Sequence, residues 1–338
     1  MNKKIIRSIL GSDVPILIWG SPGVGKTACI RAMAKDMGAE IVTLIGSTLD
    51  PSDVCGVPYV HNGELIMSTP AWAKKIKQCL DHGKQVWLFL DELSCAPPSV
   101  QAAFLRVVNE RHVGDLDISG CKVIAAANHA DTAAVGGDLS AAAANRWAHV
   151  EWQLSVDDWI TGELSGWGQL RSSEHAAAAA AVCSFVRRKP GILLSVPVKI
   201  EQHTGPWPSP RSWSNAIALI ATNTYNYSAV AATVGDSAAL EFTHYMAELD
   251  LPDPQEVLRT GCLPSRGDKL AATLDSLAAY VSVAGIADES IVTTAWDILG
   301  KCRQDIALSS AKILVHNFPH ICSEVMENFG EKIKGIKK

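Results

Sequence analysis

The fold is decided by the stretch Gly20-Ser21-Pro22-Gly23-Val24-Gly25-Lys26-Thr27, which fits the phosphate-binding pattern G-x-x-x-x-G-K-[ST]. An apolar run at 14–19 precedes it and predicts a buried strand, and residues 28–37 predict a helix that ends at Gly38. Glycines let the loop backbone approach a phosphate closely, and the N–H groups at the start of the helix point toward it. Lys26 could then reach the β- and γ-phosphates, and the Thr27 hydroxyl could hold Mg²⁺. We therefore expect residues 20–28 to bind a nucleotide, with Ala28 as the last of them.

A second chemical motif follows the apolar run at 86–90, where Asp91 and Glu92 stand side by side. Such a run predicts a buried strand, and ligands of open α/β sheets bind at the carboxyl ends of the strands. Asp91 would hold Mg²⁺, directly or through water, and Glu92 would orient the attacking water or accept its proton. Adjacent side chains on a strand point to opposite faces, so the two carboxylates are expected to do different jobs.

Two further polar residues lie at the ends of predicted elements in the same domain. Residues 121–128 predict another buried strand, and Asn128 at its end could orient the water opposite the γ-phosphate, although Asn also favours turns. Residues 139–147 predict a short helix that ends near Arg146, and 149–152 predict the last strand. A cation near a helix C-terminus is favourable in itself, so the residues alone do not favour a catalytic role for Arg146.

Two hairpins are predicted within the connections of this domain. Asn62-Gly63 stands between short strand-like runs at 57–60 and 64–67, which is a strong hairpin signal, and 112–118 predicts a second, smaller hairpin. Helices are expected at 71–82 and 99–109. From the residues alone, the first hairpin is better explained as an ordinary surface feature than as a functional insertion.

The second half of the chain predicts helices, at 155–164, 173–189 and 236–249, and throughout the residues after 254, where we find no motif. Another helix begins after Ser209, which is a suitable N-cap, with Pro210 at its first position. Arg211 would lie in its first turn, where a cation opposes the helix dipole by ~0.3–1 kcal/mol. That placement invites a functional interpretation, and a solvated surface arginine is the alternative.

The composition favours a folded protein with reduced thiols. The chain has 338 residues, 48% hydrophobic and 19% charged, so it can bury two or three domain cores with little disorder. Its nine cysteines are scattered, with no C-x-x-C pair, which gives little support to a zinc site or a disulfide framework. The N-terminus lacks the apolar region of a signal peptide, and no apolar run reaches membrane-spanning length. A cytoplasmic location without membrane insertion is therefore expected.

The order of these motifs resembles that of the AAA+ ATPases over about residues 5–220. The two hairpins, and the helix end at 105–111, are similar to the MoxR branch of that family. The resemblance implies an α/β P-loop core with a five-stranded parallel sheet of order 5-1-4-3-2, a helical lid, and assembly into a homo-oligomeric ring that is usually a hexamer. With the helical pattern above, it predicts a nucleotide-binding domain at 1–152, a lid at 153–253 and an all-helical extension at 254–338.

The resemblance also implies roles for individual residues. Lys26 and Thr27 fall in the Walker A motif, and Asp91 and Glu92 in Walker B. Asn128 takes the sensor-1 place, and Arg211 the sensor-2 place, where a lid arginine touches the γ-phosphate of its own subunit. Arg146 takes the place of the arginine finger, which acts on the nucleotide of the neighbouring subunit and stabilises charge on its γ-phosphate. Arg111 could be a second arginine of this kind.

The function implied is a ring ATPase that converts ATP and water to ADP and phosphate with Mg²⁺, and that remodels or activates a protein client. In MoxR relatives the partner is often a protein with a von Willebrand factor A domain, and the hairpin at 61–63 is our candidate for a client-facing element. A motor directed by nucleic acid is one alternative, disfavoured by the net charge of −5. An ATP-gated scaffold with little turnover is another, disfavoured because every catalytic position is filled. The chain lacks the N-K-x-D motif with which GTPases read guanine.

Overall fold

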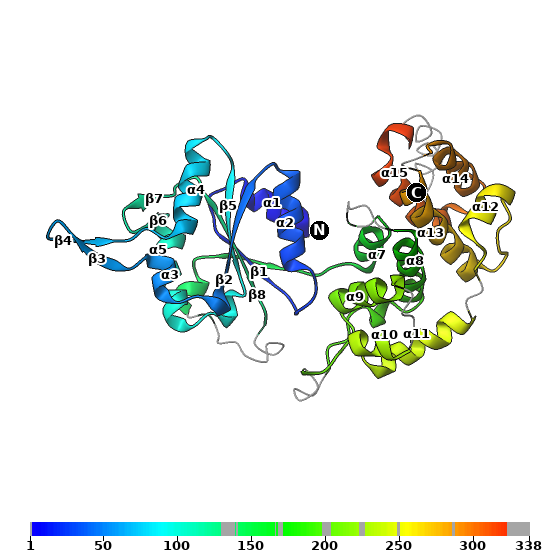
Figure 1. Cartoon of the computed structure of the whole chain (residues 1–338), viewed down its shortest axis with the longest axis horizontal. Helices are drawn as coiled ribbons and strands as arrows, with labels where there is room; N and C mark the ends of the chain where they lie inside the picture. The colour runs from blue at the N-terminus through cyan, green and yellow to red at the C-terminus, as the bar shows by residue number, and fades with distance from the viewer. Residues whose placement is uncertain are drawn as a thin grey trace. The chain divides into compact units, whose positions relative to one another are not determined.

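The computed structural model describes residues 2–129, 139, 141–165, 167, 172–197, 204–222, 227–248, 251–285 and 288–322. The chain divides into two compact units, Met1–Gln153 and Leu154–Lys338 (Figure 1). The first unit contains the sheet and the second is helical, and each is described by itself. Among the described residues, no helix is long and apolar enough to cross a membrane.

The first unit is built on a five-stranded parallel sheet. Its strands are β1 (Ile16–Trp19), β2 (Glu40–Ile45), β5 (Val86–Asp91), β8 (Lys122–Ala127) and β9 (Ala148–Glu151). They lie in the order β2-β5-β8-β1-β9. When the hairpin strands are left out of the numbering, this is the expected order 5-1-4-3-2. The central strands are nearly continuous apolar runs because both faces of a parallel sheet are covered.

Helices cover this sheet as the alternation of its side chains requires. On one face, Leu17, Leu88 and Ala125 share a buried cluster with residues of α4 (Ala71–Asp81) and α5 (Pro98–Glu110), including Phe104. Side chains of alternate residues in the same strands point to the opposite face. The remaining helices of the unit are α1 (Asn2–Leu10), α2 (Lys26–Asp36), α3 (Pro51–Cys55) and α6 (Ala141–Ala144).

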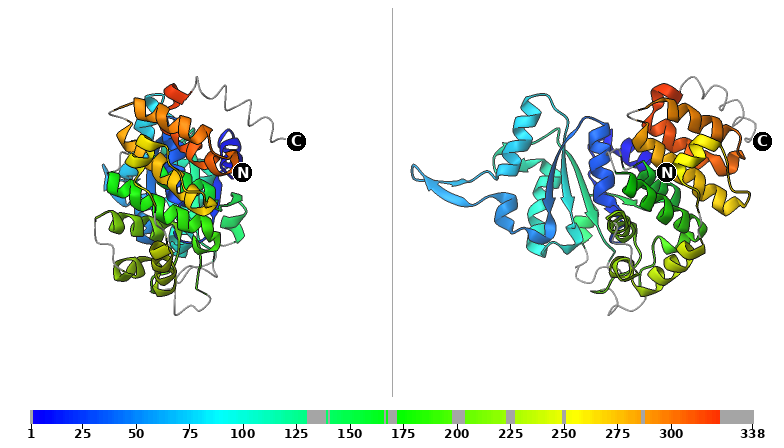
Figure 2. Two further views of the ribbon diagram at one scale, coloured as in Figure 1. Left: turned by 90° about the vertical axis from the view of Figure 1, so that its right-hand side faces the viewer. Right: turned by 45° about the vertical axis from the view of Figure 1, so that its right-hand side comes forward.

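Both predicted hairpins are present. Strands β3 (Pro58–His61) and β4 (Glu64–Met67) are antiparallel and extend away from the body of the first unit (Figure 2). Asn62 and Gly63 join them with φ angles of 53° and 83°, as a tight two-residue turn requires. The smaller hairpin is formed by β6 (His112–Val113) and β7 (Leu116–Asp117).

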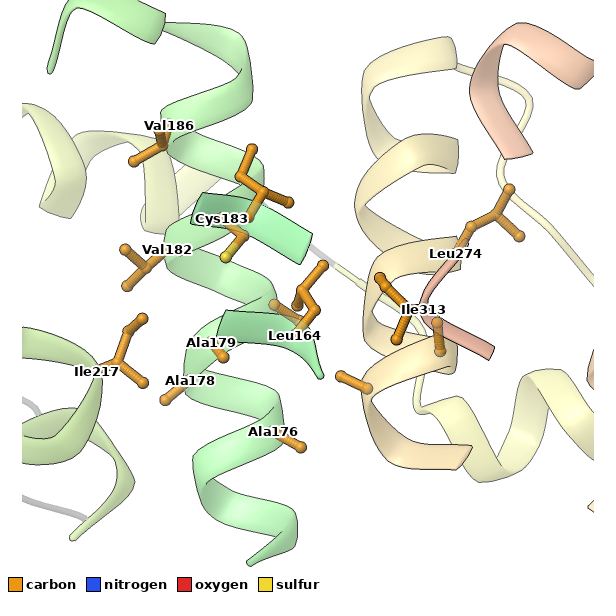
Figure 3. Close-up of a cluster of buried hydrophobic side chains, with 14 of the residues drawn as sticks. Leu164, Ala176, Ala178, Ala179, Val182, Cys183, Val186, Ile217, Leu274 and Ile313 are labelled. Carbon is orange, nitrogen blue, oxygen red and sulfur yellow. The ribbon is translucent and has the colours of Figure 1, made fainter. Parts of the chain in front are cut away.

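The second unit is a helical bundle with one core. Its helices are α7 (Val156–Leu164), α8 (Ser173–Arg188), α9 (Pro210–Ala221), α10 (Tyr227–Val234), α11 (Asp236–Glu248), α12 (Pro254–Thr260), α13 (Gly267–Ala284), α14 (Ser290–Gly300) and α15 (Gln304–Asn317). The alanine-rich α8 lies at the centre, between Ile217 of α9 and Leu274 and Ile313 of α13 and α15 (Figure 3). A single buried cluster runs from Trp159 to Cys322. The division at residue 253 into a lid and an extension stays a prediction, since in packing the two segments share one core.

A buried ion pair joins three helices of this bundle. Asp275 of α13 is only 1% exposed and accepts a hydrogen bond from the Arg187 guanidinium of α8. Arg187 also donates to Ser309 Oγ at 2.8 Å, and Ser310 Oγ donates to Asp275 Oδ1 at 2.9 Å. The carboxylate is thus satisfied from both neighbouring helices, which a buried charge needs if it is not to destabilise the fold.

Changing Asp275 to Asn is expected to lower the free energy of unfolding by about 2–3 kcal/mol, because Arg187 loses its charged acceptor where little water can replace it. Urea denaturation followed by circular dichroism measures the change. The matched control is Glu248→Gln in α11, whose exposed carboxylate lies 3.8 Å from the exposed Arg188 and should matter much less. Equal losses in the two variants would show that burial of the Asp275 pair is not the source of the effect.

Candidate nucleotide-binding and hydrolysis site

The glycine loop connects β1 to α2 in a conformation that its residue types explain. Gly23 and Gly25 have φ angles of 76° and 82°, which residues with a Cβ rarely adopt. A Cβ added at Gly20 would lie 2.9 Å from the carbonyl oxygen of Trp152, so a side chain there would force the backbone apart. Helix α2 begins at Lys26, and the N–H groups of its first turn form the anion-binding end of the helix.

Lys26 is held inside this loop by three acceptors. Its Nζ donates to the carbonyl oxygens of Gly20 and Ser21, at 2.7 and 3.0 Å, and to Asn128 Oδ1 at 2.7 Å. The backbone N–H of Asn128 donates in turn to Ser94 Oγ at 3.1 Å. The structure therefore brings together the predicted phosphate-binding lysine and the predicted sensor asparagine, which are 102 residues apart in the chain.

Thr27 and Asp91 form the second contact of the site. Thr27 Oγ1 donates to Asp91 Oδ2 at 2.7 Å. A hydroxyl and a carboxylate oxygen are ligands that Mg²⁺ takes in phosphate sites, where phosphate oxygens and water complete its octahedron. The loop backbone, the Lys26 ammonium and this oxygen pair therefore fit a magnesium–nucleotide complex.

Glu92 lies just beyond the end of β5 and has a hydrogen-bond partner of its own. Strand β5 ends at Asp91, and Glu92 takes a left-handed backbone conformation with φ of 56°. Its carboxylate accepts a hydrogen bond at Oε2 from Ser47 Oγ, 2.6 Å away. The two acids do point to different partners, but the end of the strand and not its alternation directs them.

The two predicted arginines each lie at the end of a helix. Arg146 is partly buried in the turn after α6, where its backbone N–H donates to the carbonyl oxygen of Ala143 at 3.2 Å. Arg211 is exposed in the first turn of α9, which Ser209 caps as expected. It belongs to the helical unit, so its place at the nucleotide stays a prediction. The helix expected at 139–147 falls partly outside the described residues, and α6 covers only Ala141–Ala144.

Arg111 makes contacts within its own chain, and its role between subunits stays a prediction. It is the C-cap of α5, with φ of 55°, and its guanidinium donates to the carbonyl oxygens of Val107, Val108 and Asp13. Burial lowers the pKa of this guanidinium below its ordinary value. Arg111 thus ties the end of α5 to the chain that leads into β1, which accounts for a basic residue at this helix end.

Three residues that contribute to the site were missed in the sequence. Ser47 holds Glu92, and Ser94 holds Asn128. Trp152 is buried and donates from Nε1 to the carbonyl oxygen of Val24 at 3.0 Å, so it pins the glycine loop from the end of β9. Ser47 and Trp152 each follow a strand of the sheet, and the rule that ligands bind at this edge could have singled them out.

A match to a protein-family model agrees with this geometry. Residues 16–134 match the family model "ATPase family associated with various cellular activities (AAA)". Among solved structures, the Holliday junction branch migration motor RuvB of Thermotoga maritima is similar at 15% identity and a TM-score of 0.37, over 87% of this chain and 86% of that one. A mutant of the same RuvB gives 15% identity and a TM-score of 0.38, over 87% of both chains. Residues 16–134 of this chain thus carry an AAA-family ATPase domain, within a P-loop fold of the AAA+ class.

Proposed function

We propose that this protein is a MoxR-like ring ATPase that hydrolyses ATP to ADP and phosphate and uses the reaction to remodel or activate a protein client. The observation that carries the proposal is the convergence of Lys26 with Asn128 and of Thr27 with Asp91. These four residues come from three parts of the chain, and each has the chemistry that its place in phosphoryl transfer to water demands.

Each group of the site has a distinct task in this proposal. Bound Mg²⁺ would neutralise charge on the β- and γ-phosphates. The N–H groups of the loop bind the phosphates, and Lys26 exchanges its carbonyl acceptors for phosphate oxygens. Thr27 and Asp91 hold the metal, Asn128 orients the water, and a carboxylate oxygen of Glu92 accepts the proton that the water loses. Ser47, bonded to Oε2, restrains the rotation of that carboxylate.

The experiment that tests the reaction is phosphate release by the full chain with Mg·ATP, before and after removal of the metal with EDTA. Hydrolysis is expected to stop with EDTA and to return when Mg²⁺ is restored, because Thr27 and Asp91 provide too few ligands to retain the ion alone. ATP binding without turnover would favour the gated scaffold. Stimulation by nucleic acid that falls steeply with salt would favour the nucleic-acid motor.

We further propose that the β3–β4 hairpin contacts the client, a protein with a von Willebrand factor A domain. Val60 and Leu65 are 71% and 75% exposed and face each other across the two strands. A two-stranded hairpin is marginally stable alone, so such an apolar pair at its surface suits a contact with another protein.

Changing Val60 and Leu65 together to Thr is expected to remove most of the stimulation of hydrolysis by a purified von Willebrand factor A-domain protein. Thr keeps the β-propensity of the strands and removes the apolar surface. Basal hydrolysis should stay unchanged, since the hairpin extends away from the body of the first unit (Figure 2). The control is Leu240→Thr, another exposed leucine, in α11. Full stimulation of the double variant would contradict a client-facing role for the hairpin.

A further inference from the structure

Trp19, His129, His149 and Glu151 form a cluster on β1, on β9 and just beyond the end of β8. Trp19 pairs in register with Ala127 of β8 and with Glu151 of β9, while His149 pairs with Leu17. Alternation therefore places Trp19, His149 and Glu151 on the same face of the sheet. We call this group the indole–imidazole cluster.

The rings of the cluster are nearly parallel. The Trp19 and His129 ring centroids are 5.3 Å apart with 17° between the planes, and those of Trp19 and His149 are 6.0 Å apart with 15°. His129 Nε2 lies 3.0 Å from Glu151 Oε2, so the ring that follows β8 also contacts β9. Several contacts thus hold each ring in one orientation.

The directions of two hydrogen bonds in the cluster show which ring nitrogen of His149 carries a proton. Trp19 Nε1 can only donate, and it lies 2.8 Å from His149 Nδ1, which must therefore accept. His149 Nε2 lies 2.9 Å from the carbonyl oxygen of Ala144, which can only accept. Both bonds are made only when His149 is neutral and carries its proton on Nε2.

This pair of hydrogen bonds joins two parts of the proposed site. At one end, Trp19 directly precedes Gly20, whose carbonyl oxygen accepts from Lys26. His129, which stacks on Trp19, directly follows Asn128. At the other end, Ala144 is the last residue of α6, two residues before Arg146.

Helix α6 needs such a contact to keep its position. It has four residues, far fewer than a helix requires to be stable by itself. The carbonyl oxygen of Ala144 accepts from the backbone N–H of Trp147 at 3.3 Å, and His149 Nε2 adds a second, side-chain contact to it at 2.9 Å. The His149 ring therefore holds the end of the element that presents Arg146.

We propose that His149, held by Trp19, is a positioning residue for Arg146. It fixes the end of α6 relative to the strand that carries the phosphate loop, so that Arg146 is held ready for the nucleotide of a neighbouring subunit. The effect on catalysis rests on the function proposed above for Arg146. The effect of His149 on the position of α6 does not depend on that function.

Three variants separate the hydrogen bonds from the bulk of the side chains. His149→Ala removes both bonds, and Trp19→Phe keeps an aromatic ring next to His129 but removes the N–H donor. His149→Gln keeps one acceptor and one N–H donor on a neutral side chain. The matched control is His82→Ala, because His82 Nδ1 also contacts a carbonyl oxygen in the last turn of a helix, that of Gln78 in α4.

The first measurement is hydrogen exchange in the nucleotide-free protein. The N–H groups of Asn145 and Arg146 donate to the carbonyl oxygens of Ala141 and Ala143. His149→Ala and Trp19→Phe are expected to raise their exchange rates by about tenfold, the effect of losing one hydrogen bond. His149→Gln and His82→Ala should exchange as the wild type does. Unchanged rates in His149→Ala, or rates raised equally in His149→Gln, would overturn the proposal.

The second measurement is ATP hydrolysis by the same variants. His149→Ala is expected to lower kcat by about tenfold with KM within about twofold, and to add nothing when Arg146 is already changed to Ala. Additive losses in the double variant would overturn the positioning role. If Arg146→Ala alone leaves hydrolysis unchanged, the proposed function of Arg146 fails, and the exchange rates alone decide whether His149 holds α6.

Discussion

Replacing Glu92 with Gln is expected to reduce ATP hydrolysis by about 10²–10⁴-fold while leaving ATP binding intact. Gln has nearly the same shape and can still accept a hydrogen bond from Ser47, but its neutral amide cannot take a proton from the attacking water. Because the hydrogen bonds from Lys26 to Asn128 and from Thr27 to Asp91 do not involve Glu92, the phosphate loop should bind ATP as before. The variant should therefore accumulate in the ATP-bound state.

Because the variant stays bound to ATP, the oligomeric state of the ATP-bound protein can be measured. Light scattering of the Glu92→Gln variant with Mg·ATP is expected to give a mass near six times that of the 36.1 kDa chain, and a smaller mass without nucleotide. Glu110→Gln, which changes an exposed carboxylate paired with Arg106, is the control and should hydrolyse ATP normally. A monomer in both conditions would leave Arg146 without a neighbour and would favour the ATP-gated scaffold.

The centre of the site could be predicted from the sequence because its requirements are local. Gly23 and Gly25 are needed for their positive φ angles and Gly20 for its approach to Trp152, so the loop leaves a pattern of adjacent residues. The places of Asp91 and Asn128 follow from one further rule, since each ends an apolar strand and ligands bind at that edge. Their contacts with Thr27 and Lys26 agree with that rule.

The same edge rule brings Ser47 and Trp152 close to the site, but it does not predict which partner each residue takes, because that depends on how the strands lie next to one another. Ser47 and Trp152 are ordinary residue types in ordinary contexts, and their partners, Glu92 and Val24, lie far away in the sequence. The conformation of Glu92 was also misjudged, since nothing in an apolar run followed by two acids shows where the strand ends. Such details arise from tertiary contacts and leave no local pattern.

In the helical unit, too, a local sequence pattern does not predict how distant segments pack together. Pro252-Asp253-Pro254 predicts an end to one helical segment, and the structure does begin α12 at Pro254 with Asp253 as its N-cap. Yet helices on both sides of this turn contribute to one core, in which Asp275 of α13 pairs with Arg187 of α8. A proline-rich turn shows where a helix stops, and the packing of the flanking helices decides whether a unit stops there too.

Replacing Arg146 with Ala is expected to lower kcat by about 10³–10⁵-fold, the effect of removing an arginine that stabilises charge on the transferred phosphoryl group. Binding of ATP should change little, because the phosphate loop of the same subunit is untouched. Arg106→Ala is the control, since that guanidinium lies in an exposed pair with Glu110 in the same unit. A loss of ATP binding together with hydrolysis would show that Arg146 supports its own subunit's fold or site.

Mixing two inactive variants tests whether Arg146 acts between subunits. Lys26→Ala chains lack a working phosphate loop but keep Arg146, and Arg146→Ala chains have the opposite defect. In a ring of head-to-tail interfaces, random mixing in equal amounts pairs an intact loop with an intact arginine at about a quarter of the interfaces, so about a quarter of the wild-type rate should return. An arginine acting within its own chain could not produce this recovery, because neither chain contains both groups. Activity that stays at background in the mixture, with assembled rings present, would therefore exclude the intersubunit role.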